Sequence, residues 1–238
     1  MATVQEALEA GKFFVAYQPI VDLRTKTVFA YEALVRSKDE DYPHPGVIID
    51  AALKADFMGV LGRSLRQMAV EGCPDHALFL NVHPNEFDQS WLVRPDDFMN
   101  SHEHSVYLEI TESVPLSHYQ HCNSVVSEVR RRGVMIAIDD LGAGYSNLKY
   151  IADLEPEIVK VDRGLIAGTK RGSRQHRLVT SIVELCASQG ARVVVEGIED
   201  AEELQAVIET GAHFAQGFFL GRPNAELKPV DWNSLGLK

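Results

Sequence analysis

The sequence has little cysteine and no long hydrophobic run, and both absences narrow the class of protein. Its three cysteines, Cys73, Cys122 and Cys186, show no CxxC spacing, and their odd number leaves at least one unpaired. We expect reduced, mostly buried thiols and no zinc site. No segment approaches the roughly 18 uncharged apolar residues of a membrane helix, and residues 1–12 lack the basic start and apolar core of a secretion signal. We therefore expect a soluble, cytoplasmic protein without membrane insertion.

Basic residues are outnumbered by acidic ones, which argues against a nucleic-acid polymer as partner. The chain has 23 lysines and arginines against 34 aspartates and glutamates, a formal net charge of -11. Proteins that bind a phosphate backbone gain affinity from clustered Lys and Arg. Two basic clusters, 130–132 and 170–177, are more typical of solvated helix ends or loops in so acidic a chain. The composition is that of a globular protein, and we expect a single domain over residues 1–238.

Short apolar or β-branched runs alternate with amphipathic stretches along the whole chain. The runs predict eight strands, over residues 13–18, 27–36, 77–83, 106–110, 134–140, 158–162, 192–198 and 213–219. The amphipathic stretches predict helices over residues 46–72, 115–132, 173–189 and 200–209, the third of them burying Leu178, Ile182, Leu185 and Cys186. Strands that alternate with helices at this pitch imply parallel pairing through right-handed crossovers.

This arrangement favours an α/β fold of the TIM type, a modified (β/α)8 barrel, over an open doubly wound sheet. Eight strands in 238 residues match the usual size of that barrel, about 250 residues. Only the first two strands break the rhythm, because residues 19–26 alone separate them, which is the spacing of a hairpin. We therefore expect the first strand to run antiparallel to the second.

A polar residue stands near the carboxyl end of almost every predicted strand. These residues are Glu32, Asn81, Glu109, Asp139, Asp140, Lys160, Asp162, Glu196 and Gln216. Any one of them alone could be a helix cap or a surface residue. In a barrel, however, all the carboxyl ends open on one face, where active sites are built. We predict a ring of oxygen ligands around one mouth of the barrel.

Convergent carboxylates repel one another and raise each other's pKa unless cations lie among them. Oxygen ligands without histidine or thiolate favour magnesium, manganese or calcium over zinc or copper. We predict a divalent-metal site for two ions, which one carboxylate of the adjacent pair Asp139 and Asp140 bridges. Two ions roughly 3.5–4 Å apart are the usual apparatus for hydrolysing a phosphodiester. They would also let an acidic protein bind an anionic substrate.

The tripeptide Glu32-Ala33-Leu34 begins an ordered series of motifs that contain these residues. The series continues through LNVHP (80–84), LEITES (108–113), IDDLGAGYSNL (138–148), VKVDRGLI (159–166), VVVEGIED (193–200) and QGFFLGRP (216–223). With this series of motifs, the chain resembles the EAL-domain phosphodiesterases of bacterial cyclic di-GMP signalling. The resemblance implies a modified (β/α)8 barrel with an antiparallel first strand. It also implies hydrolysis of cyclic di-GMP to linear pGpG with Mg2+ or Mn2+, two ions to a site.

The resemblance further implies roles for the residues of the metal site. Glu32, Asn81, Glu109 and Asp139 resemble ligands of the first metal, and Asp139 would bridge to the second beside Asp140. Lys160 resembles the lysine that contacts the nucleophilic water. Glu196 resembles a glutamate assigned either as general base or as a metal-site residue. We favour the second role, because water on a metal is already acidified and needs less help from a base.

Other residues resemble substrate contacts or supports. Gln216 resembles the amide that lies where the metal-bound water meets the substrate. Arg36 resembles a contact to a substrate phosphate, which suits the forked donors of a guanidinium. Glu112, Asp162 and Glu199 are assigned supporting roles, Glu112 by holding the loop after Asp140. Lys160 could instead form an ion pair with Asp162, and the two roles can coexist.

A few positions depart from the family pattern without removing a metal ligand, namely Ser37, His83, Leu141, Ala143 and Asn147. His83 lies two residues beyond Asn81 and could be an extra metal ligand, but we favour a hydrogen-bonded histidine at the rim.

The leading hypothesis is an active cyclic di-GMP phosphodiesterase. The resemblance also implies a homodimer, because in this family the loop at 141–148 couples metal binding to dimer contacts. One alternative is a catalytically inactive cyclic di-GMP receptor of the same fold. Another is a different magnesium-dependent barrel enzyme, such as an enolase-like lyase. Sensory domains or partner proteins outside this chain are also expected from the resemblance.

Overall fold

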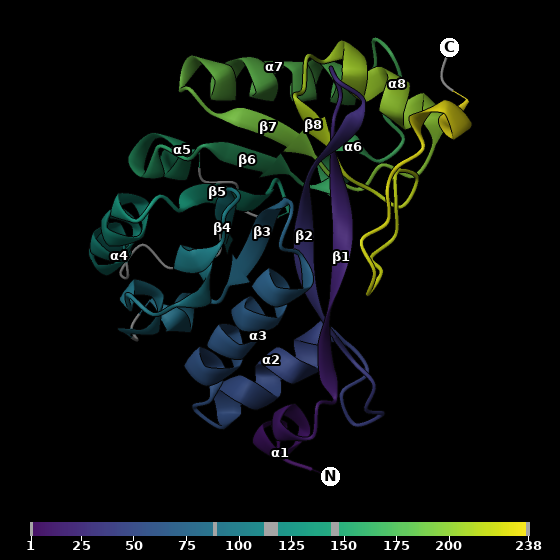
Figure 1. The fold of residues 1–238 in the computed structure, drawn as a ribbon. Coiled ribbons are helices and arrows are strands. Elements are labelled where there is room, and N and C mark those ends of the chain that lie inside the picture. The colour runs from purple at the N-terminus through teal and green to yellow at the C-terminus, as the bar shows by residue number, and fades with distance from the viewer. Residues whose placement is uncertain (1, 88–89, 112–118, 144–147, 237–238) are drawn as a thin grey trace.

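The computed structural model describes residues 2–87, 90–111, 119–143 and 148–236, and the side chains of these residues except 90–91 and 119–122. Eight strands close into a barrel in which spatial neighbours follow the order of the chain (Figure 1). The strands are β1 (Phe13–Asp22), β2 (Thr27–Ser37), β3 (Ala77–Val82), β4 (Val106–Thr111), β5 (Met135–Leu141), β6 (Ile158–Val161), β7 (Arg192–Val195) and β8 (Phe214–Ala215).

Strand direction follows from the lengths of the connections. A short turn joins β1 to β2, and this hairpin is antiparallel, with Gln18 opposite Glu32. Strand β1 is also antiparallel to β8, whereas the pairs from β2 to β8 are parallel. The predicted barrel and its antiparallel first strand are confirmed. Strand β8 is shorter than the predicted 213–219, because β7 ends at Val195 and Ala215 is the last residue of β8 that is paired with it.

Helices surround the barrel between the strands. They are α1 (Val4–Glu9), α2 (Pro45–Lys54), α3 (Met58–Gly72), α4 (Tyr119–Arg131), α5 (Lys149–Leu154), α6 (Arg163–Ile166), α7 (Arg174–Ser188) and α8 (Ala201–Glu209), with short 3-10 turns η1 (Pro84–Glu86), η2 (Ser90–Val93), η3 (Phe98–Ser101) and η5 (Trp232–Leu235). None of the helices in the described ranges is long and apolar enough to cross a membrane.

Two details of the helices differ from the prediction. The single helix expected over 46–72 is two helices, because Asp56 adopts a left-handed conformation with φ 51° and ends the first. An aspartate tolerates that conformation, so neither glycine nor proline marks the break. On α7 the buried face is formed by Val179, Val183 and Cys186. The predicted face is wrong at Leu178, which is 47% exposed, and at Leu185, which is 38% exposed.

Aromatic side chains close the end of the barrel where the parallel strands begin. Phe79 stacks on Tyr107 with ring centroids 4.4 Å apart, and Phe29 stacks on Phe214 at 4.0 Å. The guanidinium of Arg192 lies over the rings of Phe29 and Phe214. This end of the interior is therefore filled mainly by apolar and aromatic side chains, whereas the carboxylates and amides of the strands gather at the opposite mouth.

A second apolar core supports the β1–β2 hairpin where it extends past the barrel toward α1 and α2 (Figure 1). It is formed by the buried residues Val4, Ala7, Phe13, Tyr42, Ile48, Ala52, Met58 and Leu61. This core holds α2 and α3 against one side of the mouth. Cys73 and Cys186 are buried free thiols, as predicted for a reduced protein, and the side chain of Cys122 lies outside the described ones.

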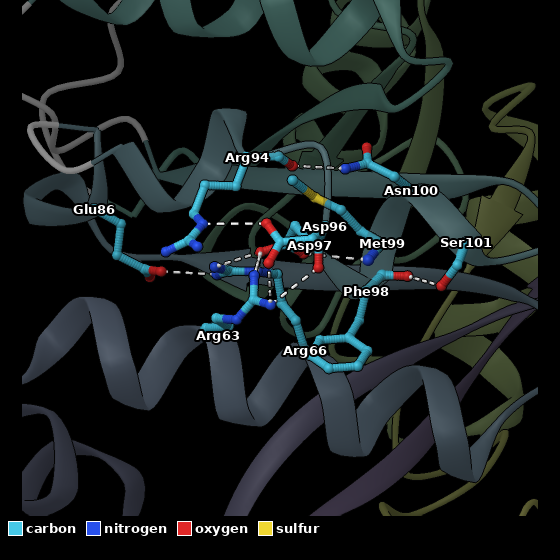
Figure 2. A network of polar contacts seen from close by, with 10 residues as sticks. All are labelled: Arg63, Arg66, Glu86, Arg94, Asp96, Asp97, Phe98, Met99, Asn100 and Ser101. Carbon is cyan, nitrogen blue, oxygen red and sulfur yellow. Dashed lines mark hydrogen bonds and ion pairs between the residues drawn. The ribbon is translucent and has the colours of Figure 1, made fainter.

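A buried ion-pair network joins α3 to the segment that follows β3 (Figure 2). Arg66 Nη1 donates to Glu86 Oε2 at 2.7 Å, and its Nε and Nη2 donate to Asp97 Oδ2 at 3.3 and 3.2 Å. All three side chains are almost fully buried. Gly62 permits the approach, because a Cβ there would lie 2.1 Å from Glu86 Oε2. The network therefore fixes the segment after β3 against α3.

Replacing Arg66 with methionine should strongly destabilise the protein, because it leaves Glu86 buried without a cation and leaves Asp97 only its longer contact with Arg63, at 3.8 Å. Breaking such a buried pair costs about 3–5 kcal/mol. Urea unfolding followed by circular dichroism measures the loss. The control Lys170→Met removes one partner of the exposed pair with Glu202 and should leave the free energy of unfolding nearly unchanged.

The loss from Arg66→Met should also depend on pH. Burial raises the pKa of Glu86, and Arg66 opposes that rise. Without Arg66 the native-state pKa lies further above the unfolded value, so the native variant binds more protons and its stability falls as pH rises through that range. We expect a larger destabilisation at pH 8 than at pH 5. Equal losses at both pH values would contradict this account.

Candidate functional site

The ammonium group of Lys160 lies at the centre of the polar mouth and faces four carboxylates. Its Nζ is 2.5 Å from an oxygen of Glu109, 2.7 Å from Glu196, 3.1 Å from Asp139 and 3.4 Å from Glu32. Lys160 is fully buried, and it reaches the mouth from β6, while the carboxylates come from β2, β4, β5 and the residue after β7. The structure thus gathers residues that are up to 164 positions apart in the sequence around one cation.

Two amide side chains complete the inner ring by donating to Glu32. Asn81 Nδ2 donates to Glu32 Oε1 at 3.2 Å, and Gln216 Nε2 donates to Glu32 Oε2 at 2.6 Å. Parallel pairing also places Asn81 of β3 opposite Glu109 of β4, at the same height in the barrel. The predicted ring of oxygen and amide groups therefore lies at one mouth.

An irregularity in β5 turns both members of the acidic pair toward the mouth. Successive residues of a regular strand point to opposite faces. Asp140 instead adopts a left-handed conformation with φ 59°, and the pairing of β5 with β6 shifts between Ile138 and Leu141. One oxygen each of Asp139, Asp140 and Glu196 consequently lie within 4.8 Å of one another. A bulge of this kind re-aims a side chain next to functional sites.

The negative charge of this cluster exceeds what Lys160 can balance. Four carboxylates face one ammonium group, and Asp140 adds a fifth carboxylate beside them. Burial and the neighbouring Glu32 raise the pKa of Glu109 well above its usual value, and burial with Asp139 raises that of Asp140 to about 6. Burial also raises the pKa of Glu196. Although burial opposes it, the surrounding carboxylates raise the pKa of Lys160, so the lysine stays charged.

Several buried oxygens of the cluster have no directed hydrogen bond. Among the described residues these are both oxygens of Glu109, Asp139 Oδ1 and Gln216 Oε1. Lys160 lies close to the carboxylates, but its Nζ also lacks a hydrogen bond of good geometry. Buried polar atoms without partners are costly, and hard divalent cations prefer such oxygen ligands. The donor set therefore fits magnesium, manganese or calcium.

The remaining predicted residues lie around this cluster. Arg36 borders the mouth on the side of Asn81, where its Nη1 donates to the carbonyl of Val35 at 2.8 Å. Asp162 caps α6 by accepting from the backbone N–H of Gly164 at 2.7 Å. An ion pair of Lys160 with Asp162 is absent from the described part of the chain, so that alternative is wrong. Glu199, half exposed, binds Arg163 at 2.6 Å.

Two parts of the prediction fall outside the described residues. Glu112, expected to hold the loop after Asp140, is among them, as are residues 144–147 of that loop. The start of the loop is described, and Gly142 there has φ 106°. A Cβ on Gly142 would lie 2.3 Å from Leu165 Cδ1, so only glycine fits against α6.

Two cavities lie at the mouth and share Leu34 as a lining residue. The first, of about 310 Å³, is lined by Glu32, Asp139, Asp140 and Glu196. The second, of about 450 Å³, is lined by Arg36, Asn81 and His83 together with apolar residues of α2 and α3. The mouth therefore offers a ligand two adjoining cavities, one at the carboxylates and one beside Asn81.

Two residues of the first cavity were not predicted from the sequence. Phe218 is 49% exposed there, with the guanidinium of Arg222 4.2 Å from its ring centroid. Arg163 also lines the cavity and is anchored by a bond from Nη1 to the carbonyl of Gly197 at 2.7 Å. Both residues stand beside predicted site residues, Phe218 after Gln216 and Arg163 after Asp162. Only the fold shows that they face the same cavity.

Binding of Mn2+ or Mg2+ should stabilise the native protein, because the unfolded chain lacks the assembled ligands. A concentration of 100 times the dissociation constant adds about 2.7 kcal/mol. Asp139→Asn should remove most of this effect. The control Asp75→Asn changes an exposed carboxylate just before β3, at the other end of the barrel, and should keep it.

Melting curves recorded across a metal titration, with reversal by EDTA, measure this stabilisation. Equal shifts in the wild type and in Asp139→Asn would show that the metal binds elsewhere.

Comparisons with known proteins agree with this geometry. RocR, a cyclic di-GMP phosphodiesterase of Pseudomonas aeruginosa, is 30% identical over 251 residues, which cover 98% of this chain and 63% of RocR. The structure of PaMucR phosphodiesterase in complex with cyclic di-GMP superposes with a TM-score of 0.79 and 27% identity, over 93% of this chain and 95% of that one. BlrP1 of Klebsiella pneumoniae, solved with manganese and cyclic di-GMP, gives 0.78 and 27%, over 93% and 58%.

The chain spans 28% to 63% of the lengths of eight curated relatives that it matches, so it corresponds to one part of those proteins. The family model described as the EAL domain matches residues 1–223. This match covers nearly the whole barrel and includes every residue of the carboxylate cluster. The chain belongs to the EAL domain family.

Proposed function

We propose that this chain hydrolyses cyclic di-GMP to linear pGpG as a metal-dependent phosphodiesterase. The observation that carries the proposal is the cluster of five carboxylates around Lys160, with buried oxygens that lack hydrogen bonds. The names of RocR and of the PaMucR structure support the choice of substrate, because both relatives act on or bind cyclic di-GMP. An acidic site of this kind needs cations before it can accept a phosphodiester.

Two divalent ions, Mg2+ or Mn2+, would be held by the carboxylates of the cluster. Glu32, Asn81, Glu109 and Asp139 are the proposed ligands of one ion, and Asp139, Asp140 and Glu196 those of the other. Such ions lower the pKa of bound water and stabilise negative charge on the phosphodiester oxygens. The complex of BlrP1 with manganese and cyclic di-GMP supports the choice of a divalent metal together with this substrate.

Side chains of the cluster orient the attacking water and the metal ligands. Lys160 holds four carboxylates in place and offers ammonium protons to an attacking water at the centre of the cluster. Gln216 fixes Glu32 with its amide nitrogen, and its unpartnered Oε1 remains able to accept a hydrogen bond from water or substrate. Glu196 serves in the metal site, and we assign it no separate role as general base.

The two cavities would receive the two halves of the dinucleotide. Arg36, on the side of the larger cavity, bonds within the described residues only through Nη1, so the rest of its guanidinium can donate to a phosphate. Phe218 presents an exposed ring in the smaller cavity, on which a base can stack. The shared position of Leu34 between the cavities suits a substrate that crosses the carboxylate cluster.

The broader setting of the site is also a proposal. We place the protein in the cytoplasm, where cyclic di-GMP acts as a second messenger, and we assign it a homodimer on the basis of the family resemblance. Glu112, Asp162 and Glu199 would support the loops around the mouth. The cap that Asp162 provides for α6 and the ion pair between Glu199 and Arg163 support the latter two assignments.

Glu32→Gln should lower the kcat for hydrolysis of cyclic di-GMP by more than about 100-fold. Loss of a residue that only orients a metal ligand typically costs about 10- to 100-fold in activity, and loss of the ligand itself should cost more. The substitution keeps the size of the side chain and removes its charge. The assay follows pGpG by chromatography with Mn2+ or Mg2+ present. Glu103→Gln is the matched control, because Glu103 is exposed on the loop before β4, away from the mouth.

Equal inertness of the wild type and Glu32→Gln would overturn the proposed activity. Calorimetric binding of cyclic di-GMP by an inert wild type would instead favour the receptor of the same fold. Hydrolysis of other phosphodiesters with no preference for cyclic di-GMP would keep the chemistry and reject the substrate.

A further inference from the structure

The larger of the two cavities has mostly apolar walls and few polar groups that are free to contact a ligand. Its apolar wall includes Ile49 of α2 and Met58 and Leu65 of α3. Arg66 and Glu86 also line it, but they satisfy each other in the buried network. Such walls suit the face of a nucleobase better than a phosphate, so a polar group at the rim would decide how a base is oriented.

His83 at the end of β3 is such a group, and its hydrogen bonds define which ring nitrogen carries the proton. His83 Nδ1 lies 3.2 Å from the backbone nitrogen of Asn85, which can only donate. Nδ1 is therefore the acceptor, and in the neutral ring the proton resides on Nε2. The ring is partly exposed, and its one side-chain hydrogen bond among the described residues is the one that Nδ1 accepts. This arrangement also argues against Nδ1 as an extra metal ligand.

The buried network fixes His83 before any ligand arrives. The backbone N–H of His83 donates to Glu86 Oε1 at 3.1 Å, while the other oxygen of Glu86 accepts from Arg66. Arg66 is tied in turn to Asp97, and Figure 2 shows Glu86 and Asp97 approaching its guanidinium from two sides. The backbone bond and the bond at Nδ1 already fix the imidazole ring, so Nε2 loses little conformational freedom when it binds a ligand.

We propose that His83 binds the substrate by donating a hydrogen bond from Nε2 to the base that enters the larger cavity. The inference rests on the proposed function and adds a residue that recognises the nucleoside. Guanine presents two neighbouring acceptors, N7 and O6, on one edge. A neutral donor at the rim of an apolar cavity complements that edge, while Arg36 on the same cavity remains available for the phosphate. His83 is thus a determinant of KM and takes no part in the chemical step.

The test uses two substitutions that separate the two ring nitrogens. His83→Asn places an amide oxygen near the position of Nδ1, where it can still accept from Asn85, but leaves no donor at the position of Nε2. His83→Gln can place an amide nitrogen near Nε2. One neutral hydrogen bond corresponds to a change of about 3- to 10-fold in affinity. We expect His83→Asn to raise KM for cyclic di-GMP by that factor with kcat within twofold, and His83→Gln to recover most of the loss.

His104→Asn is the matched control, because His104 is exposed on the loop that precedes β4, at the opposite end of the barrel. It should leave KM unchanged. An unchanged KM in His83→Asn would overturn the inference about His83. Activity of the wild type in the same assay would still uphold the proposed function. A fall in kcat alone, or a lower melting temperature, would show that His83 only supports the fold.

If the wild type is inert, the proposed function fails on its own, and calorimetry with cyclic di-GMP decides the inference. A dissociation constant about 3- to 10-fold higher for His83→Asn than for the wild type would support it. Equal constants, or no binding to either protein, would overturn it.

Discussion

The structure of the mouth depends on one buried positive charge. Lys160 is fully buried and lies within 3.4 Å of four carboxylates that belong to different strands or strand ends. Without this cation, the burial of Glu109 and its neighbours would cost several kcal/mol for each charge. Yet one ammonium group cannot balance five carboxylates or satisfy their oxygens. Lys160 therefore makes the burial of these carboxylates tolerable and still leaves oxygens that suit divalent cations.

The barrel provides the rest of this arrangement by geometry. Parallel strands bring Asn81 and Glu109 to equal height, and the left-handed residue Asp140 turns a second carboxylate to the side of Asp139. Aromatic rings fill the other end, so the carboxylates and amides of the strands gather at the carboxyl end of the barrel. An aspartate tolerates this conformation, and uncommon backbone conformations of this kind cluster at functional sites.

The sequence was sufficient to predict the barrel, the antiparallel first strand and the set of residues at the mouth. Strand periodicity and hairpin spacing are local signals, and the position of a charged residue at a strand end is visible without coordinates. The break at Asp56 and the exposed Leu178 were missed, because an aspartate in a left-handed conformation and a helix rotated by one residue leave little trace in hydrophobic periodicity. Phe218, Arg163 and the free Nε2 of His83 depend on contacts between distant segments, which periodicity does not contain.

The central claim is that this excess of buried carboxylate oxygens is a binding site for two divalent ions. Crystals soaked in Mn2+ and measured at the manganese absorption edge test it most directly. The account predicts two anomalous peaks roughly 3.5–4 Å apart, one on each side of Asp139. A map without peaks at the cluster, or with manganese only at surface carboxylates, would contradict it.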